Sequence, residues 1–392
     1  MKRLASIFCL IFAFSYSFGI VLNKIKITGN THTDAKTILE IAQELKEGEE
    51  YSEEKLKNLA LRIEERLKNT GWFYNASVYI VESGQNENYR NVIIEVEEGF
   101  LYRFYGGNAY GGFGMDNVYG QGGGYRIELG YNRQALRYEK LFPSYHLKFT
   151  TDIGNINRQI YSSENREIKL QSVLINSGIF YLMNWDLLFY LDGEYSKNFD
   201  TSYNWLFDSY FAGCGLILDK RNKRFSPSKG YYLKLSLNYL DFNYLRFSSE
   251  GRIFFELMNG LTFGTKVLFA TEDENVPYYH KLSINGIDGV RNLFSYSIGN
   301  SIVQANLELR WKVFNYKLFS MIDTFIETLV FVDFGKATES LNEITTFDNY
   351  GVAFGTGVRI FFDNPVFLPL RFEVGFDKDF KTVFYFDASY PF

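Results

Sequence analysis

The chain has 392 residues, with 41 Lys and Arg against 46 Asp and Glu and a formal net charge of −5. An acidic balance argues against nucleic acid as a partner, because binding phosphates requires clustered positive charge. Cys9 and Cys214 are its two cysteines, too few for a disulfide framework or a cysteine-based metal site. We therefore expect no bound metal and no cofactor.

The chain is rich in aromatic residues and glycine, with 39 Phe, 30 Tyr and 33 Gly but only 6 Pro. Its mean hydropathy is −0.17. Soluble cores are built mainly from aliphatic residues. A transmembrane barrel alternates apolar with polar residues and carries aromatic girdles at both membrane interfaces. The composition therefore favours a transmembrane antiparallel β-barrel.

Residues 1–19 have the pattern of a secretory signal. Lys2 and Arg3 precede an apolar run that ends at Phe14, and small residues at 17 and 19 suit a cleavage site. The apolar run is shorter than the roughly 20 residues that a membrane-spanning helix needs. We predict that residues 1–19 are a signal peptide that is removed.

Residues 20–99 predict one small α+β domain with the order β-α-α-β-β. Its apolar residues first alternate, then recur every three or four positions, then alternate again. The predicted elements are a strand around 24–28, a helix capped by Thr33 or Asp34 and running through Leu45, a helix from Ser52 to Thr70, and strands at 73–81 and 92–97.

From residue 100 onward the pattern is that of short alternating strands, clearest where Leu233, Leu235 and Leu237 alternate with polar residues. The firmest predicted strands are near 207–219, 230–241, 243–257, 259–271, 300–313, 325–335, 349–361, 367–377 and 382–392. Residues 100–392 accommodate about sixteen strands of roughly ten residues each with their connections. Strand numbers of about twelve or fourteen stay open as alternatives.

Short motifs in both regions resemble one known family. Residues 27–30 (ITGN), 71–73 (GWF) and 97–99 (EEG) resemble those of a single POTRA domain. Residues 308–310 (ELR), 331–335 (FVDFG), 357–359 (GVR) and 370–372 (LRF) resemble the barrel of the BamA/TamA-type outer-membrane assembly superfamily, also called the bacterial surface antigen barrel. Each motif is short, but their order and spacing together are specific. The resemblance implies a periplasmic POTRA domain at 20–99 and an outer-membrane β-barrel at 100–392.

The resemblance also implies two groups of site residues. Asp219, Arg221, Pro227 and Gly230 match the family's turn motif. Arg291 matches the arginine at the tip of the family's long loop, although Asn292 and Leu293 stand where the family has Gly and an aromatic residue. In the family this arginine meets acids at the positions of Glu308 and Asp333, inside the lumen. The alternative is a solvated loop arginine, which would contribute little.

The predicted first and last barrel strands differ in character. Gly106 and Gly107 lie in the first strand, and glycine weakens a strand ladder. Phe384, Phe386 and Phe392 share one face of the last strand, which must be paired to avoid aggregation. We predict a weak lateral seam between these strands that can open to a client strand. The alternative is that the glycines form only a loop.

These features predict a protein that assembles, inserts or translocates other proteins at the outer membrane. The expected partners are unfolded outer-membrane or secreted protein clients, outer-membrane lipid and periplasmic chaperones, and the barrel is expected to be monomeric. A dedicated two-partner-type exporter and a passive porin are the alternatives. An enzyme is not expected, because no Gly-x-Ser-x-Gly motif is present and His32, His146 and His280 are scattered.

Overall fold

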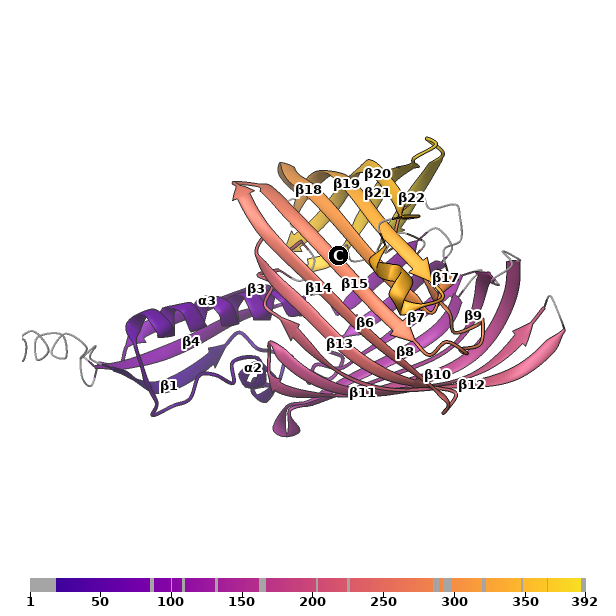
Figure 1. Cartoon of the computed structure of the whole chain (residues 1–392). Coiled ribbons are helices and arrows are strands. Elements are labelled where there is room, and N and C mark those ends of the chain that lie inside the picture. The colour runs from indigo at the N-terminus through magenta and orange to yellow at the C-terminus, as the bar shows by residue number, and fades with distance from the viewer. Residues whose placement is uncertain are drawn as a thin grey trace, which may run out of the picture.

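The computed structural model describes residues 19–84, 88–99, 101–107, 110–130, 133–161, 167–201, 204–223, 226–284, 286, 289–291, 298–318, 322–346, 348–364 and 366–388. The predicted signal peptide, apart from Gly19, and Phe392, Asn292 and Leu293 lie outside these residues. A small N-terminal domain projects from one rim of a large barrel (Figure 1).

The N-terminal domain is a four-stranded sheet with two helices. Its elements are β1 Ile20–Thr28, α2 Ala35–Ile41, β2 Glu50–Tyr51, α3 Glu53–Thr70, β3 Phe73–Glu82 and β4 Tyr89–Glu98. The sheet order is β2-β1-β4-β3, with β1 and β4 parallel and β3 antiparallel to β4. Leu22, Ile38, Ile63 and Ile94 are among the fully buried residues of its core. Among the described residues, no helix is long and apolar enough to cross a membrane.

Two details of this domain differ from the sequence prediction. The first helix ends at Ile41 rather than Leu45. The chain turns there because the hydroxyl of Tyr51 donates to the Glu44 carbonyl at 2.9 Å and accepts from Lys46 N at 3.0 Å. The second difference is β2, to which Tyr51 belongs. The sequence did not predict this strand, because two residues are too few to give an alternating pattern. The second helix begins as predicted, because Ser52 caps Lys55 N at 3.2 Å.

The long strands that follow the N-terminal domain form a closed antiparallel barrel. They are β5 Tyr102–Gly107, β6 Tyr110–Asp116, β7 Gly124–Gly130, β8 Arg133–Phe142, β9 Leu147–Tyr161, β10 Glu167–Asn184, β11 Leu187–Asp200, β12 Trp205–Asp219, β13 Gly230–Leu240, β14 Tyr244–Met258, β15 Leu261–Glu272, β18 Ser301–Leu318, β19 Ile322–Thr338, β20 Gly351–Asn364, β21 Val366–Asp377 and β22 Thr382–Ala388. Each pairs with its neighbours in chain order, and β22 returns to β5. The barrel predicted from the sequence is confirmed, while the number of strands in the complete chain stays a prediction.

Shorter elements lie in the connections of the barrel. A 3₁₀ turn, η1 (Pro143–Tyr145), joins β8 to β9 and contacts α2 of the N-terminal domain. The long connection from β15 to β18 contains a small two-stranded sheet of β16 (Leu282–Ser283) and β17 (Ile298–Gly299). A second 3₁₀ turn, η2 (Leu341–Thr345), follows β19.

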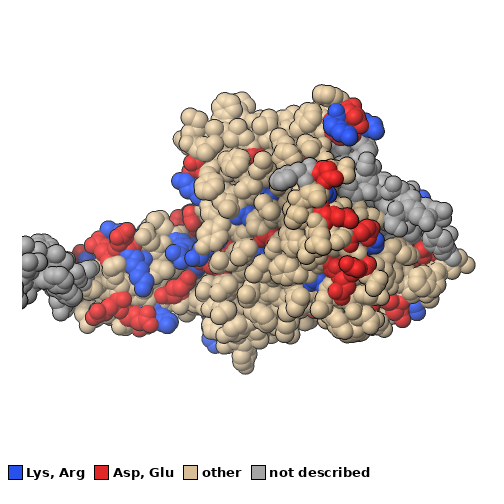
Figure 2. Space-filling view, viewed as in Figure 1, with Lys and Arg blue, Asp and Glu red and all other residues tan. Residues whose placement is uncertain are grey.

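The wall of the barrel is apolar outside and polar inside. On β13, Leu233 and Leu237 are exposed, whereas Ser236 and Asn238 are buried toward the interior. Charged side chains are sparse on the barrel wall in Figure 2 and frequent on the N-terminal domain. A wall of this kind places apolar side chains against lipid and polar ones in the lumen.

Candidate functional site

Arg291 lies inside the barrel and is 1 % exposed. Its Nε and Nη2 donate to the two carboxylate oxygens of Asp333 at 2.8 Å each, and its backbone N donates to Asp333 Oδ2 at 3.0 Å. Its Nη1 donates to Glu308 Oε1 at 2.8 Å and to Glu373 Oε2 at 2.9 Å. The guanidinium carbon also lies 3.5 Å from the ring centroid of Phe331. One loop arginine is therefore held by three buried carboxylates and an aromatic face.

A second layer of arginines neutralises the same acids. Arg359 donates to both oxygens of Glu308 at 2.8 Å and to Glu373 Oε1 at 2.8 Å. Arg310 donates to Glu308 at 2.7 Å, and Arg371 donates to Glu373 at 3.1 Å. Arg359 Nη1 also lies 3.8 Å from Glu327 Oε1. We call the whole group the lumenal charge cluster: Arg291, Glu308, Arg310, Glu327, Asp333, Arg359, Arg371 and Glu373. Its four arginines balance its four acids, as charges buried this deeply require.

Strand register brings these residues together. The cluster side chains other than Arg291 come from the lumenal faces of β18, β19, β20 and β21, which are consecutive in the barrel. Val290 packs against Gly335, where an added Cβ would lie only 2.6 Å from the valine Cγ2. A glycine at this position of β19 therefore leaves room for the loop, and the loop carries Arg291 into the cluster.

The predicted turn motif lies between β12 and β13. Arg221 donates to the two oxygens of Asp219 at 2.8 and 2.7 Å, and Pro227 is buried. Gly230 has φ of +101°, and a Cβ there would lie 2.1 Å from the Lys220 carbonyl oxygen. Only glycine fits this position without displacing the backbone. The four motif residues thus build one compact turn.

The barrel closes where β22 meets β5. Among the described residues this seam consists of two pairs, Asp387 with Gly107 and Ala388 with Gly106. On its other side, β22 pairs with β21 from Arg371–Asp387 to Phe376–Thr382. Phe384 is 77 % exposed and Phe386 is 42 % exposed on the outer wall. Both described pairs of the seam therefore place a glycine of β5 opposite a residue of β22.

The N-terminal domain contacts the barrel rim through four successive turns. Arg66, on α3, donates to Glu44 at 2.5 and 2.8 Å and to Asp186, in the β10–β11 turn, at 2.8 Å. Burial raises the pKa of Glu44, but the hydrogen bond and charge of Arg66 outweigh burial and bring it below its ordinary 4.5. The other contacts are Thr33 with Asn117 after β6, Glu40 with His146 after β8, and Asn69 with Asn222 after β12.

A Ser, a His and an Asp meet at the opposite rim but do not form a catalytic triad. Ser209 Oγ lies 3.2 Å and Asp241 Oδ2 lies 2.9 Å from His280 Nε2. A triad requires the Ser and the Asp on different ring nitrogens. Tyr279 donates to the same Asp241 oxygen at 3.0 Å, so this group holds the 273–281 segment onto the rim. The described residues also contain no group of His, Cys, Asp and Glu arranged to hold a metal ion.

Family models match both parts of the chain. Residues 116–392 match the Omp85 superfamily domain, and residues 20–99 match the POTRA model, described as a surface antigen variable number repeat. The first match covers more than half of the chain. The chain belongs to the Omp85 superfamily. The family predicted from the sequence motifs, with a single POTRA domain, is therefore confirmed.

Solved structures of Omp85-type barrels share the fold at low identity. BamA from Haemophilus ducreyi lacking POTRA domains 1–3 is 15% identical with a TM-score of 0.55, over 94% of this chain and 83% of that chain. CdiB from Escherichia coli is 12% identical with a TM-score of 0.62, over 94% and 75%. CdiB from Acinetobacter baumannii is 14% identical with a TM-score of 0.60, over 95% and 74%. A comparison with curated proteins finds no match.

Membership of this superfamily places the protein, in general terms, in outer-membrane protein insertion or secretion. Proteins of this type are transporters or assembly factors. The family also implies the bacterial outer membrane as location, with the POTRA domain on the periplasmic side. The rim that contacts the POTRA domain is then the periplasmic rim.

Sequence reasoning grouped Arg291, Glu308 and Asp333, and the structure brings these three together. It missed Glu373, Arg359, Arg310, Arg371 and Glu327. A signal existed, because residues 371 and 373 alternate with Phe372 and so share the polar face of their strand. It also missed the contact of Arg66 with Asp186, which joins residues 120 positions apart and follows no local pattern.

Proposed function

We propose that this protein inserts or translocates client proteins at the outer membrane by capturing them on its POTRA domain and opening the seam between β22 and β5. The observation that carries the proposal is that both described residue pairs of this seam place a glycine of β5, Gly107 or Gly106, opposite β22, because glycine weakens a strand ladder. The clients are unfolded outer-membrane or secreted proteins. Residues 1–19 act as a removed signal, and 20–99 and 100–392 act as the periplasmic and membrane units.

The proposed step exchanges one strand pairing for another. When β5 separates from β22, peptide groups of Gly106 and Gly107 lose their partners in a medium that cannot hydrogen bond to them. A client strand that pairs with the opened edge restores those bonds. A seam lined by glycines is suited to this exchange, because glycine weakens the strand ladder that must first separate.

The lumenal charge cluster has a separate proposed role. It fixes the loop that carries Arg291 to β18–β21, so that this side of the barrel stays rigid while the seam opens. Outer-membrane lipid surrounds the apolar wall, and periplasmic chaperones deliver clients to the POTRA domain. The barrel acts as a monomer.

A disulfide across the seam tests the proposal. Gly107→Cys with Asp387→Cys joins the two strands at a described pair. The control is Val374→Cys with Phe384→Cys, which joins β21 to β22 and leaves the seam free. Each variant complements cells depleted of the protein, and outer-membrane proteins are quantified by mass spectrometry. We expect the control to restore the membrane proteome, and the seam disulfide to restore it only after reduction.

Other outcomes identify the alternative functions. Full complementation by the oxidised seam variant overturns the seam mechanism. Loss of a single secreted protein on depletion, with all barrels retained, identifies a dedicated exporter, the second candidate that the likeness to CdiB brings forward. An unchanged proteome together with large, stable conductance identifies a passive porin.

A further inference from the structure

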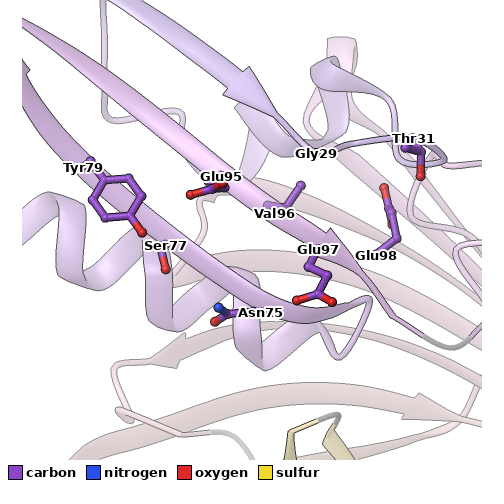
Figure 3. Close-up of a pocket in the computed structure, with 9 residues that line it drawn as sticks. All are labelled: Gly29, Thr31, Asn75, Ser77, Tyr79, Glu95, Val96, Glu97 and Glu98. Carbon is purple, nitrogen blue, oxygen red and sulfur yellow. The ribbon is translucent and has the colours of Figure 1, made fainter.

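The barrel lumen contains a cavity near the rim opposite the POTRA domain. Its volume is about 380 Å³. The wall is formed by side chains of β10 to β14, and the 273–281 segment adds Tyr279, His280 and Lys281. The cavity is separate from the groove of about 560 Å³ on the POTRA sheet, which is lined by side chains of β3 and β4 (Figure 3). The mechanism proposed above makes no use of the cavity in the lumen.

The Arg and Lys side chains that line this cavity are bound to acids outside it. Arg246 donates to Glu272 at 2.8 Å and also to the backbone oxygen of His280. Lys281 donates to the two oxygens of Glu339 at 2.8 and 2.6 Å. Glu272 and Glu339 do not contribute to the cavity wall. The positive charge of the wall is therefore already compensated from outside the cavity.

Asp192 differs from these residues, because no ion pair joins it to a cation within the described chain. Its side chain lines the cavity from β11, and its Oδ1 has no hydrogen-bond partner among the described residues. Gly213 on β12 makes room for this carboxylate, since an added Cβ there would collide with the same oxygen. A carboxylate accepts hydrogen bonds and donates none. The cavity therefore offers a charged acceptor to a cationic donor.

An apolar wall lies beside this carboxylate. Phe211 and Leu240 line the cavity, and Phe211 pairs in register with Glu194 on one side and with Leu240 on the other. Glu194 is two residues from Asp192 and on the same lumenal face of β11. The Tyr279 ring adds an aromatic surface from the 273–281 segment. A carboxylate next to apolar and aromatic side chains suits a ligand that joins an ammonium group to a methylene chain.

We propose that this cavity binds a small aliphatic amine, with its ammonium group on the Asp192 carboxylate and its methylene chain against Phe211 and Leu240. The volume of about 380 Å³ lies within the range of small-molecule sites. The ligand contacts both the barrel wall and the 273–281 segment, so its binding adds contacts that hold this segment on the rim. The site is independent of the proposed opening of the seam.

Two probes of equal chain length test the site by isothermal titration calorimetry of the full chain in detergent micelles. Putrescine (1,4-diaminobutane) carries an ammonium group at each end, whereas 1,4-butanediol has the same carbon chain without charge. We expect putrescine to bind at least about tenfold more tightly, the effect of one hydrogen bond to a charged group. Equal binding of the two probes, or no detectable binding of putrescine, overturns the inference.

Asp192→Asn removes the charge of the site and keeps the shape of the side chain. It is expected to weaken putrescine binding at least about tenfold. The matched control is Glu250→Gln, which removes an equal charge from the lumenal face of β14 but lies outside the cavity. It is expected to leave binding within about twofold of the native chain, because distant charges are screened. Equal weakening by both variants would mean attraction by the overall charge of the lumen and would overturn the site.

A variant that should gain affinity separates loss of the site from damage to the fold. Lys234, on β13, acts on Asp192 through its charge but forms no ion pair with it within the described chain. Its charge opposes a bound ammonium group, so Lys234→Gln is expected to tighten putrescine binding about threefold. Circular dichroism and heat-modified gel mobility check that each variant is folded. Unchanged or weaker binding by folded Lys234→Gln contradicts the proposed position of the ammonium group.

Discussion

Replacing Arg291 by Ala is expected to release the loop from the lumen, and the contacts give the size of the effect. Without Arg291, Glu308 keeps Arg359 and Arg310, and Glu373 keeps Arg359 and Arg371. Asp333, whose side chain is fully buried, loses both guanidinium bonds. Breaking a buried pair so that one charge stays unpaired costs about 3–5 kcal/mol. The opening equilibrium of the loop then rises roughly 10²- to 10⁴-fold.

Thiol protection measures this opening. Val290 is fully buried beside Arg291, so Val290→Cys, in a chain whose Cys9 and Cys214 are replaced by Ser, reacts with a maleimide only when the loop leaves the lumen. We expect Arg291→Ala to accelerate labelling by at least about 10²-fold. Adding Asp333→Asn removes the unpaired charge and is expected to restore part of the protection.

The control for this measurement is a second bidentate pair. Arg137 donates to Asp152 at 2.5 and 2.7 Å across β8 and β9, which lie outside the sector of the barrel that holds the loop. Arg137→Ala is expected to leave labelling of the introduced thiol at position 290 unchanged. If Arg291→Ala labels within about threefold of the native sequence, Arg291 does not hold the loop and the reasoning is refuted.

Two further predictions concern the turn and the periplasmic rim. Gly230→Ala is expected to destabilise the barrel by about 1–3 kcal/mol, because Gly230 has a positive φ and lies close to the Lys220 carbonyl. The control is Gly251→Ala, where an added Cβ meets nothing within 4 Å. Heat-modified gel mobility measures the stability of both variants. The contact of Glu44 with Arg66 is expected to be complete above pH 4.5 and to weaken as pH falls through the lowered pKa of Glu44. Limited proteolysis of the joint between the domain and the barrel from about pH 7 to about pH 3 checks this, and weakening above about pH 5 would contradict it.

The sequence predicted those features that rest on local pattern or on a family motif. Alternation along residues 231–239 located a barrel strand, and the motif around Arg291 identified two of its three acids. The third, Glu373, lies on β21, which is three strands away from the β18 strand of Glu308 in the barrel order. Its approach to Arg291 depends on the register of β18 to β21, which no local pattern specifies.

The contacts of His146 were beyond sequence reasoning for a related physical reason. In the sequence it is one of three scattered histidines, and in the structure its Nδ1 lies 2.7 Å from Glu40 Oε1 of the POTRA domain. Glu40 is itself 5 % exposed, although it lies on a short helix where a solvated residue is expected. The contact follows from the placement of one folded unit against another, which is decided by whole surfaces rather than by segments.

The contacts that hold the barrel strands in place are concentrated in two sectors of the barrel. Their positions bear on where the barrel can open. The POTRA domain holds the turns after β6, β8, β10 and β12, and the lumenal charge cluster joins β18 to β21. The seam between β22 and β5 lies between these two restrained sectors, and both of its described pairs include a glycine of β5. Separating β20 from β21 would break a long ladder and the bonds between Arg359 and Glu373 as well. Opening at the seam breaks neither set of restraints, so the same contacts that stiffen the two sectors direct the proposed opening to β22 and β5.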